Sequence, residues 1–252
     1  MTKKIILFIV EGLSDKDALE PIIAELVDTT KIMFEVLRCD LTTNISDVWL
    51  RNLNMKERVA RIVKNFLEQN HGIKKKHIEK IIFLTDMDGC YIDEKYIYYC
   101  KDDREFRYED DGIYTDRVTT AIKRNQMKSR NLNIVNSTRE IYNLPFEIYY
   151  FSCNLDHVLH DERNLKQSLK EDYAFDFADK YEDKEDEFID FINDKSLYLS
   201  LNYKDSWQLI KENKNSLLRY TNLNVFFINN IEYMKENAKI KINNYLNKYP
   251  AK

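Results

Sequence analysis

Acidic residues and a glycine directly follow two apolar runs of this chain. The first run, residues 5–10, is followed by Glu11 and Gly12, and the second, residues 81–84, leads into Asp86-Met87-Asp88-Gly89. Each run has the length of a buried strand, and ligands bind at the carboxyl ends of strands in open α/β sheets. Because magnesium takes oxygen ligands, these two strand ends together predict a divalent-metal site.

The chemistry best suited to such a site is phosphodiester hydrolysis. Asp86 and Asp88 are two residues apart at one strand end, so both can converge on one or two ions. Glu11, on a neighbouring strand, would complete the site or act as a general base. Two ions about 3.5–4 Å apart would stabilise the attacking and leaving oxygens. Asp15, at the start of the helix expected after Glu11, and Asp156, after a later apolar run, are further candidate ligands.

Each of these acids also has a structural interpretation. Glu11 or Asp15 could be an acid that favours the start of a helix through the helix dipole. The turn at residues 86–89 could be an Asx turn. Asp156 could be an ordinary acid in the first turn of a helix. The functional interpretation therefore depends on the combination of separate strand ends.

The combination resembles the Toprim domain. Glu11-Gly12 after the first strand, Asp15 three residues further on and Asp86-x-Asp88 after a later strand have its order, with the glutamate first and the DxD pair second. The resemblance extends from the start of the chain to about position 160. Residues 152–159 also resemble the acidic third motif of small stand-alone and OLD-like Toprim proteins. The resemblance implies acid–base work for Glu11, metal binding for the DxD pair, and further ligation by Asp15 and Asp156.

The resemblance also implies a fold, an activity and a biological context. The fold would be a Toprim-like, Rossmann-like, mostly parallel sheet flanked by helices. The activity would be a Mg²⁺- or Mn²⁺-dependent nuclease acting on DNA or RNA. Small Toprim proteins of this layout resemble anti-phage defence effectors, among them the PARIS-type effector, which acts on tRNA and works with an ATPase. This chain has no G-x-x-x-x-G-K-[ST] phosphate loop, so an OLD-like or ABC-type ATPase would have to be a separate polypeptide.

Two other functions remain open. Residues 85–90 approach the DxDGT motif of HAD-type phosphatases, in which Asp86 would be the nucleophile and Asp88 the acid–base residue, with Ser152 imitating the second motif. However, Cys90 replaces the threonine, and Glu11-Gly12 would have no role. Alternatively, a non-catalytic Toprim-like module would keep the same acids to bind nucleic acid or a partner.

Charge is unevenly distributed along the chain, whose formal net charge is −4. Residues 115–139 hold six basic residues against one acid, and predict a basic helix that either contacts backbone phosphates or only faces solvent. The candidate phosphate contacts are Arg117, Lys123, Arg124, Lys128 and Arg130. By contrast, residues 170–194 hold eleven acids and three lysines, which could form a docking surface for a partner or a solvated helix face.

Alternating strands and helices must position these residues. Strands are predicted at 4–10, 32–37 and 80–85, with helices beginning near Ser14 and Ser46 between them. This order predicts a mostly parallel sheet covered by helices. The remaining expectations are an irregular lid or insertion at 90–113, a helix at 115–131 and a strand at 146–151.

The last third of the chain predicts helices. Aromatic and aliphatic residues recur there at every fourth position, as in Leu165, Leu169, Tyr173, Phe177 and Tyr181. We therefore expect a catalytic domain at 1–161 and a helical appendage at 162–252. No Gly/Ser/Pro linker separates them, so the appendage should pack on the domain, and its helices could also support a homodimer.

Composition favours a cytoplasmic protein that does not enter a membrane. Hydrophobic residues make up 44% of the chain, yet no apolar run approaches the ~20 residues needed to span a bilayer. The acids after the first run, without a small-residue cleavage site, argue against a signal peptide. The four cysteines have no CxxC spacing, which indicates reduced thiols rather than a zinc site or a disulfide framework.

Overall fold

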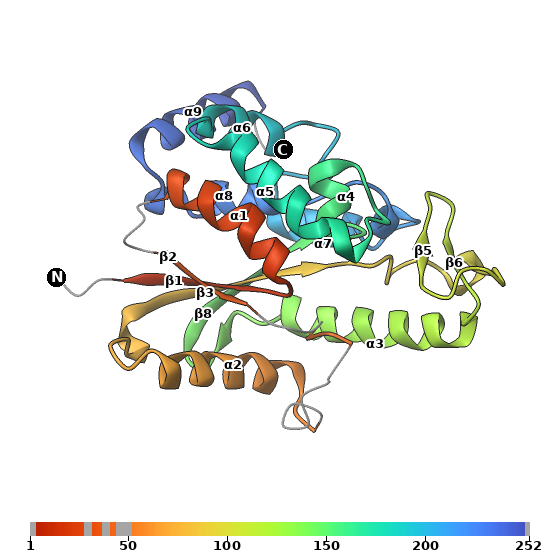
Figure 1. The fold of residues 1–252 in the computed structure, drawn as a ribbon. Helices are drawn as coiled ribbons and strands as arrows, with labels where there is room; N and C mark the ends of the chain where they lie inside the picture. Colours follow the sequence, from red (N-terminus) through yellow and green to blue (C-terminus); the bar gives the residue numbers. More distant parts are fainter. Residues whose placement is uncertain (1–3, 28–31, 37–40, 44–51, 250–252) are drawn as a thin grey trace.

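The protein is an α/β structure with two mixed sheets flanked by helices (Figure 1). The computed structural model describes residues 4–27, 32–36, 41–43 and 52–249. This arrangement is compatible with a Rossmann-like α/β fold. The α/β class predicted from the sequence is confirmed, whereas the Toprim-like character stays a prediction.

The main sheet has five strands in the order β2-β1-β3-β8-β7. β1 pairs in parallel with β2 and β3, β3 pairs in parallel with β8, and β7 pairs antiparallel with β8. The carboxyl ends of β1, β3 and β8 therefore meet at one edge of the sheet. The strand bounds are Ile5–Val10 for β1, Ile32–Val36 for β2, Ile78–Asp86 for β3, Glu140–Ile141 for β7 and Leu144–Phe151 for β8.

Two apolar cores lie on the two faces of this sheet. On β1, Phe8 faces the core that contains α1, Leu13–Leu26, whereas Leu7 and Ile9 face the core that contains α2, Met55–Gln69. Side chains of successive strand residues point to opposite faces, which explains why the first strand is apolar throughout. Figure 1 shows α2 and α3 on one side of the sheet and α1, α5, α6 and α9 on the other.

The described part of the second predicted helix begins later than expected. Asn54 caps α2 by accepting a hydrogen bond from the Glu57 N–H at 3.1 Å, and the Glu57 carboxylate accepts one from the Asn54 N–H at 2.9 Å. This reciprocal capping box fixes the start at Met55. The predicted start near Ser46 lies outside the described residues. α3 covers Val118–Asn136, which confirms the predicted basic helix with a shift of a few residues.

The segment at 90–113, expected to be irregular, contains a small sheet. Its three strands are β4, Ile97–Tyr99, β5, Arg107–Tyr108, and β6, Ile113–Thr115, in the order β4-β6-β5. A Cβ on Gly112 would lie 2.1 Å from the Tyr96 carbonyl oxygen, so this pairing requires a glycine there. Most of this segment is irregular, as predicted, but the prediction missed the strands because they are only two or three residues long and show no extended alternation.

The last third of the chain is helical, as predicted. The helices are α4, Leu155–His160, α5, Lys170–Tyr181, α6, Glu185–Ile192, α7, Tyr203–Leu209, α8, Leu223–Asn229, and α9, Glu236–Lys248. α5 and α6 pack on α1, and α8 packs on β8. Trp207 of α7 lies in the opposite core, 5.2 Å from the Tyr150 ring. Residues beyond 161 thus contribute to both cores, while the predicted domain boundary stays a prediction.

One segment of this last third connects the turn after β3 with the turn after β8. The Ser216 carbonyl accepts hydrogen bonds from the Gly89 N–H and the Cys153 N–H, each at 3.1 Å. The Tyr220 carbonyl accepts one from the Ser152 N–H at 2.6 Å. The turn after β3 and the turn after β8 therefore share one backbone acceptor.

We expect Gly89→Ala to destabilise the protein by about 1–3 kcal/mol. Gly89 has a φ of +66°, and a Cβ there would lie 2.5 Å from Cδ2 of the buried Leu217. Gly72→Ala is the matched control, because nothing lies within 4 Å of the place that its new methyl group would take; its effect should stay within about 0.5 kcal/mol. Urea unfolding measures both, and equal effects of the two substitutions would contradict the role assigned to this turn.

Candidate functional site

The predicted acids are distributed around the shared edge of β1, β3 and β8. Glu11 follows β1 directly, and its Oε1 accepts a hydrogen bond from the Thr85 hydroxyl on β3 at 2.9 Å. Asp86 is the last residue of β3, and Asp156 lies in the first turn of α4, just beyond β8. The structure thus brings acids from three separate strand ends to one edge.

Asp86 is at the electrostatic centre of this group. Its Oδ1 accepts a hydrogen bond from the Leu155 N–H at 2.9 Å. Burial, followed by the negative charges of Asp15 and Asp88, raises the pKa of Asp86 well above its ordinary value of 3.8. Lys128 and Lys170 oppose this rise without cancelling it. The surroundings of Asp86 therefore disfavour a negative charge on its carboxylate.

Asp15 lies in the first turn of α1 and close to Asp86. Its Oδ2 accepts a hydrogen bond from the Gly12 N–H at 2.9 Å, which is the cap contact expected of a helix-start acid. Burial is the main cause that raises the pKa of Asp15, and the charge of Asp156 raises it further. Asp15 therefore stabilises the start of α1, and its carboxylate also acts on Asp86.

The Asp88 carboxylate contacts two cations, and its backbone is in the left-handed region. Its φ is 49°, and its N–H donates to the Cys153 carbonyl at 2.6 Å. Its Oδ2 lies 2.5 Å from Lys128 Nζ and 3.8 Å from Arg124 Nη1. The Tyr108 hydroxyl donates to its Oδ1 at 3.4 Å.

Asp156 has a lysine partner of its own. It is 5% exposed, and its Oδ2 lies 2.7 Å from Nζ of Lys170, the first residue of α5. The sequence analysis identified neither Lys170 nor Tyr108 as a site residue. Each lies on a different element from the acid that it contacts, and no local spacing connects either pair. Only the folded chain brings them together.

The candidate phosphate contacts divide between two faces of α3. Lys128 is fully buried, and Arg124 is mostly buried, with its guanidinium donating to the Asp88 carbonyl at 3.0 Å and to the Tyr108 hydroxyl at 2.7 Å. These two cations therefore contact the acidic site itself. The other three candidates, Arg117, Lys123 and Arg130, are exposed. Arg117 also donates to the Arg104 carbonyl.

The side chains at this edge offer the oxygen donors that a hard divalent cation prefers, but they do not form a complete set of ligands. Within the described residues, no three Asp, Glu, His or Cys side chains are grouped so that they could hold a metal ion. Magnesium, however, usually takes only one or two carboxylates and keeps several waters or substrate oxygens as its other ligands. The carboxylates of Asp15 and Asp88 beside Asp86, whose mutual repulsion a cation would relieve, suit that mode of binding.

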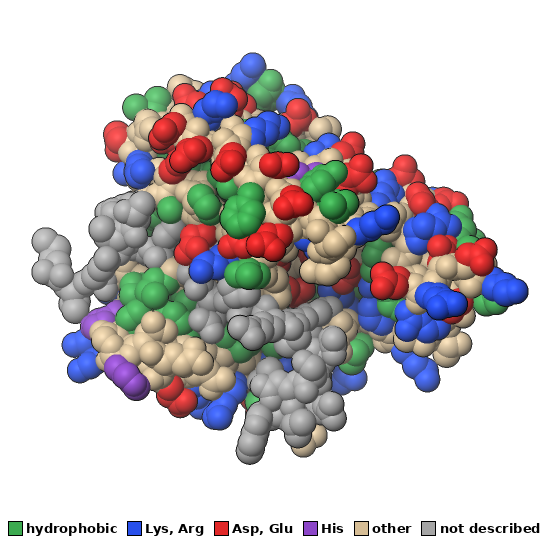
Figure 2. All heavy atoms as spheres, in the orientation of Figure 1, with side chains coloured by type: hydrophobic (Ala, Val, Ile, Leu, Met, Phe, Trp, Pro, Cys, Tyr) green, Lys and Arg blue, Asp and Glu red, His purple; other side chains and the backbone are tan. Residues whose placement is uncertain are grey.

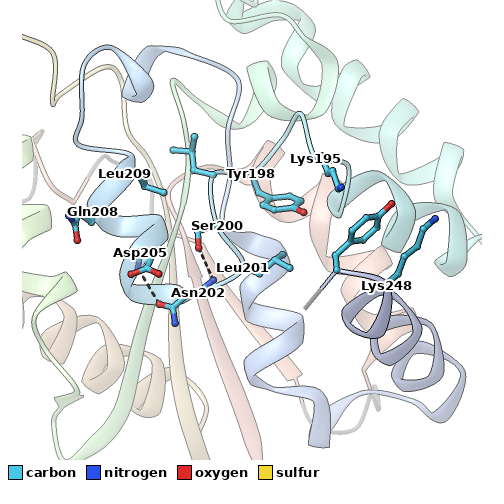
Figure 3. Close-up of a pocket in the computed structure, with 11 residues that line it drawn as sticks. Lys195, Tyr198, Ser200, Leu201, Asn202, Asp205, Gln208, Leu209 and Lys248 are labelled. Atoms are coloured by element: carbon cyan, nitrogen blue, oxygen red, sulfur yellow. Dashed lines mark hydrogen bonds between the residues drawn. The ribbon is translucent and has the colours of Figure 1, made fainter. Parts of the chain in front are cut away.

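Other surface features lie apart from these acids. Figure 2 shows acidic side chains crowded over the helices above the sheet, where most acids of residues 170–194 are exposed. A hollow of about 680 Å³ lies between α7 and the end of α9 (Figure 3). Its described lining includes Lys195, Tyr198 and Lys248, and none of the five candidate acids. No helix in the described part of the chain has the length and apolar character to cross a membrane.

Comparison with known proteins found no matching family model, no matching curated protein and no matching solved structure.

We expect Asp86→Asn to raise the melting temperature at pH 7 in metal-free buffer. Because the pKa of Asp86 is raised on folding, the folded protein retains a proton that the unfolded chain releases as the pH rises above 3.8. Stability therefore falls with rising pH through this window, and asparagine, which keeps the acceptor for Leu155, avoids the loss. The gain should disappear as the pH is lowered to about 3.8.

Asp93→Asn provides a control of opposite sign. The backbone N–H of Lys95 lowers the pKa of Asp93, so its ionised form stabilises the fold above its ordinary pKa and this contribution is lost as the pH falls. Thermal melts between pH 3.5 and 8 compare the two variants. Loss of stability at pH 7 for Asp86→Asn would contradict the electrostatic description of the site.

Proposed function

We propose that this protein is a divalent-metal-dependent nuclease of Toprim-like architecture that hydrolyses phosphodiester bonds. The observation that supports this function best is that acids follow the carboxyl ends of β1, β3 and β8 at one edge of the sheet, where burial and the charges of Asp15 and Asp88 raise the pKa of Asp86. Such a concentration of carboxylates favours a bound cation. A purely structural role would not require three strand ends to contribute acids.

The roles follow from the positions of the side chains. Asp86 and one further carboxylate, from Glu11 or Asp15, would hold the Mg²⁺ or Mn²⁺ ion together with water or substrate oxygens, and Asp88 and Asp156 would contribute negative charge nearby. The ion would supply charge stabilisation for the reacting phosphate and activation of the attacking water. Glu11, positioned by the Thr85 hydroxyl at 2.9 Å, is the candidate to accept the proton of that water.

The nucleic acid would lie over the outer face of α3. Lys123 and Arg130 are exposed and seven residues apart, so they lie close to one line along the helix. Arg117 is a further exposed cation, at the N-cap of α3. Backbone contacts of this kind orient a strand without reading its sequence, which leaves both DNA and RNA, including tRNA, as substrates to test.

The biological part of the proposal depends on the resemblance to Toprim effectors. In this proposal the protein is a cytoplasmic anti-phage defence effector whose activity is released by a separate OLD-like or ABC-type ATPase. The exposed acids of residues 170–194 offer a surface for such a partner, and the C-terminal helices offer one for a second copy of this chain.

A HAD-type phosphatase remains the second candidate, because Asp86 and Asp88 have the same spacing in both families. One observation argues against it. Ser152, which would imitate the second phosphatase motif, is fully buried, and its hydroxyl donates to the Asn215 carbonyl at 2.7 Å. A non-catalytic binding module is the third candidate, and loss of metal-dependent turnover in every assay would favour it.

We expect the wild type to cut at least one of plasmid, single-stranded DNA and total tRNA in the presence of Mg²⁺ or Mn²⁺. Glu11→Gln and Asp86→Asn should each reduce the rate by a factor on the order of 10²–10⁴, because each removes a charged group from the reacting centre. Glu68→Gln, at an exposed position of α2, is the matched control and should keep the wild-type rate.

The same assay separates the competing functions. Hydrolysis of small phosphate esters that survives Glu11→Gln would establish the phosphatase. Metal binding without cleavage of any polymer, both with and without the candidate ATPase, would instead favour the binding module.

We expect Lys123→Ala and Arg130→Ala to weaken nucleic-acid binding and to reduce its salt dependence. Each lost phosphate contact should lower the slope of log K against log salt by about 1. Fluorescence anisotropy in the Asp86→Asn background measures binding without cleavage. Lys56→Ala, an exposed lysine on α2, is the control. An unchanged slope for both α3 variants would show that the nucleic acid binds another surface.

A further inference from the structure

Two neighbouring hollows beside α7 form one groove. The hollow of about 680 Å³ between α7 and the end of α9 shares Leu201 and Asn202 with a second hollow of about 500 Å³. Figure 3 shows Lys195, Tyr198 and Lys248 gathered at one end of the first hollow. The groove therefore has an end with two lysines and a tyrosine, and it continues past Asn202 into the second hollow.

Lys195 and Lys248 place two ammonium groups near one aromatic ring. Lys195 Nζ lies 3.8 Å and Lys248 Nζ lies 5.3 Å from the centroid of the Tyr249 ring. In the part of the chain that the structure describes, neither ammonium lies within 4.0 Å of a carboxylate oxygen. Two like charges in this arrangement repel each other, and an anion between them would relieve the repulsion. This end of the groove is therefore suited to a phosphate.

Two further cations line the second hollow. Arg139 and Lys204 are exposed there, and among the described residues neither has a carboxylate oxygen within 4.0 Å. Arg139 lies shortly after the end of α3, the helix whose outer face carries the proposed phosphate contacts. Lys211, which follows α7, donates to the Asn133 side chain of α3 at 2.7 Å. The second hollow therefore lies close to the C-terminal end of the basic helix.

Most carboxylates near the groove already have partners. Glu147, in the second hollow, lies 2.7 Å from Lys80 Nζ. In an adjoining hollow, Asp190 pairs with a lysine of α9 at 2.8 Å, and Asp194 accepts hydrogen bonds from a nearby serine. Within the described lining of the groove, four cations without a carboxylate partner thus face one carboxylate without a cation, Asp205. This local excess of positive charge, in a chain of formal net charge −4, favours a polyanion.

Tyr198 gives the groove an aromatic surface. Its hydroxyl shares a hydrogen bond of 2.6 Å with the Tyr245 hydroxyl, which orients the ring, and the side chain is partly exposed. Nucleic-acid bases of any sequence can stack on such a ring, but bases within a duplex are already stacked on one another. A tyrosine beside two lysines therefore suits an unpaired nucleotide better than a duplex.

We propose that this groove binds a single-stranded segment of the nucleic-acid substrate. One base lies on the Tyr198 ring, its phosphate lies between Lys195 and Lys248, and the strand continues past Asn202 toward Arg139. None of the five candidate acids lines the groove, so it holds the substrate at a distance from the reacting phosphate. This inference rests on the proposed nuclease and specifies the substrate class as single-stranded.

Fluorescence anisotropy in EDTA tests this inference, because binding is then measured without metal-dependent cleavage. The probes are a short labelled oligonucleotide, as DNA and as RNA, and the blunt duplex of the same sequence. We expect the full-length protein to bind the single strand at least about tenfold more tightly than the duplex. Tyr198→Leu should weaken single-strand binding by about fivefold to a hundredfold, because base stacking is lost, whereas Tyr198→Phe, which keeps the ring, should retain most of the affinity.

A charge variant tests the phosphate end of the groove. The double substitution of Lys195→Ala and Lys248→Ala should lower the slope of log K against log salt by about 0.7 for each lysine that contacts a phosphate of a single strand. Lys56→Ala, at an exposed position of α2, is the matched control and should keep the wild-type slope. Circular dichroism melts establish that each variant is folded.

The outcomes separate this inference from the proposed function. Equal affinity for duplex and single strand, or full single-strand affinity in both Tyr198→Leu and the double lysine variant, would overturn the groove and leave metal-dependent cleavage in place. Tighter binding of AMP than of the oligonucleotide would also overturn it, and would indicate a site for a small ligand. Absence of binding to every probe would overturn the inference, and absence of metal-dependent cleavage as well would remove the proposed function.

Discussion

Mutual repulsion among the carboxylates at one edge of the sheet is the constraint on which the rest of the site depends. Two like charges 4 Å apart repel by about 1 kcal/mol in water and by about 4 kcal/mol at the effective dielectric of a protein surface. The fold offsets this repulsion from both sides of the sheet, since Lys128 comes from α3 and Lys170 from α5 (Figure 1). They do not offset it fully, since the pKa of Asp86 stays raised by burial and by the charges of Asp15 and Asp88.

Holding these charges in place also requires a strained backbone. Asp88 and Cys153 both have positive φ values, 49° and 48°, in the turns that follow β3 and β8. Such conformations persist only where the surrounding structure determines them. Here the Asp88 N–H donates to the Cys153 carbonyl, and the Ser216 carbonyl accepts from Cys153 and from Gly89, which follows Asp88. The last third of the chain is therefore part of the site's support and not only a cover for the sheet.

The sequence predicted the parts of this arrangement that depend on local patterns. The strand ends at Glu11 and Asp86 were recognisable because a buried strand is apolar throughout and stops where its backbone leaves the core. The pairing of Lys128 with Asp88 was not predictable, since the two lie far apart in the sequence and the contact depends on how α3 lies against the sheet. Lys170 and Tyr108 were missed for the same reason. The short strands within residues 97–115 were not predicted, because two or three residues are too few to show an alternating pattern.

The two faces of α3 connect the charge of the site to the surface beside it. Arg124 and Lys128 are one helical turn apart and face inward with Asn125 and Leu132, while Lys123 and Arg130 face solvent. The inward face of this helix needs an explanation, because a buried cation is tolerated only when it is paired with a carboxylate. The inner cations are therefore explained by the acids, and the outer ones are available to a polyanion. A phosphate backbone on the outer face would lie against the same rigid element that neutralises Asp88, so the position of α3 determines both the charge of the site and the placement of its substrate.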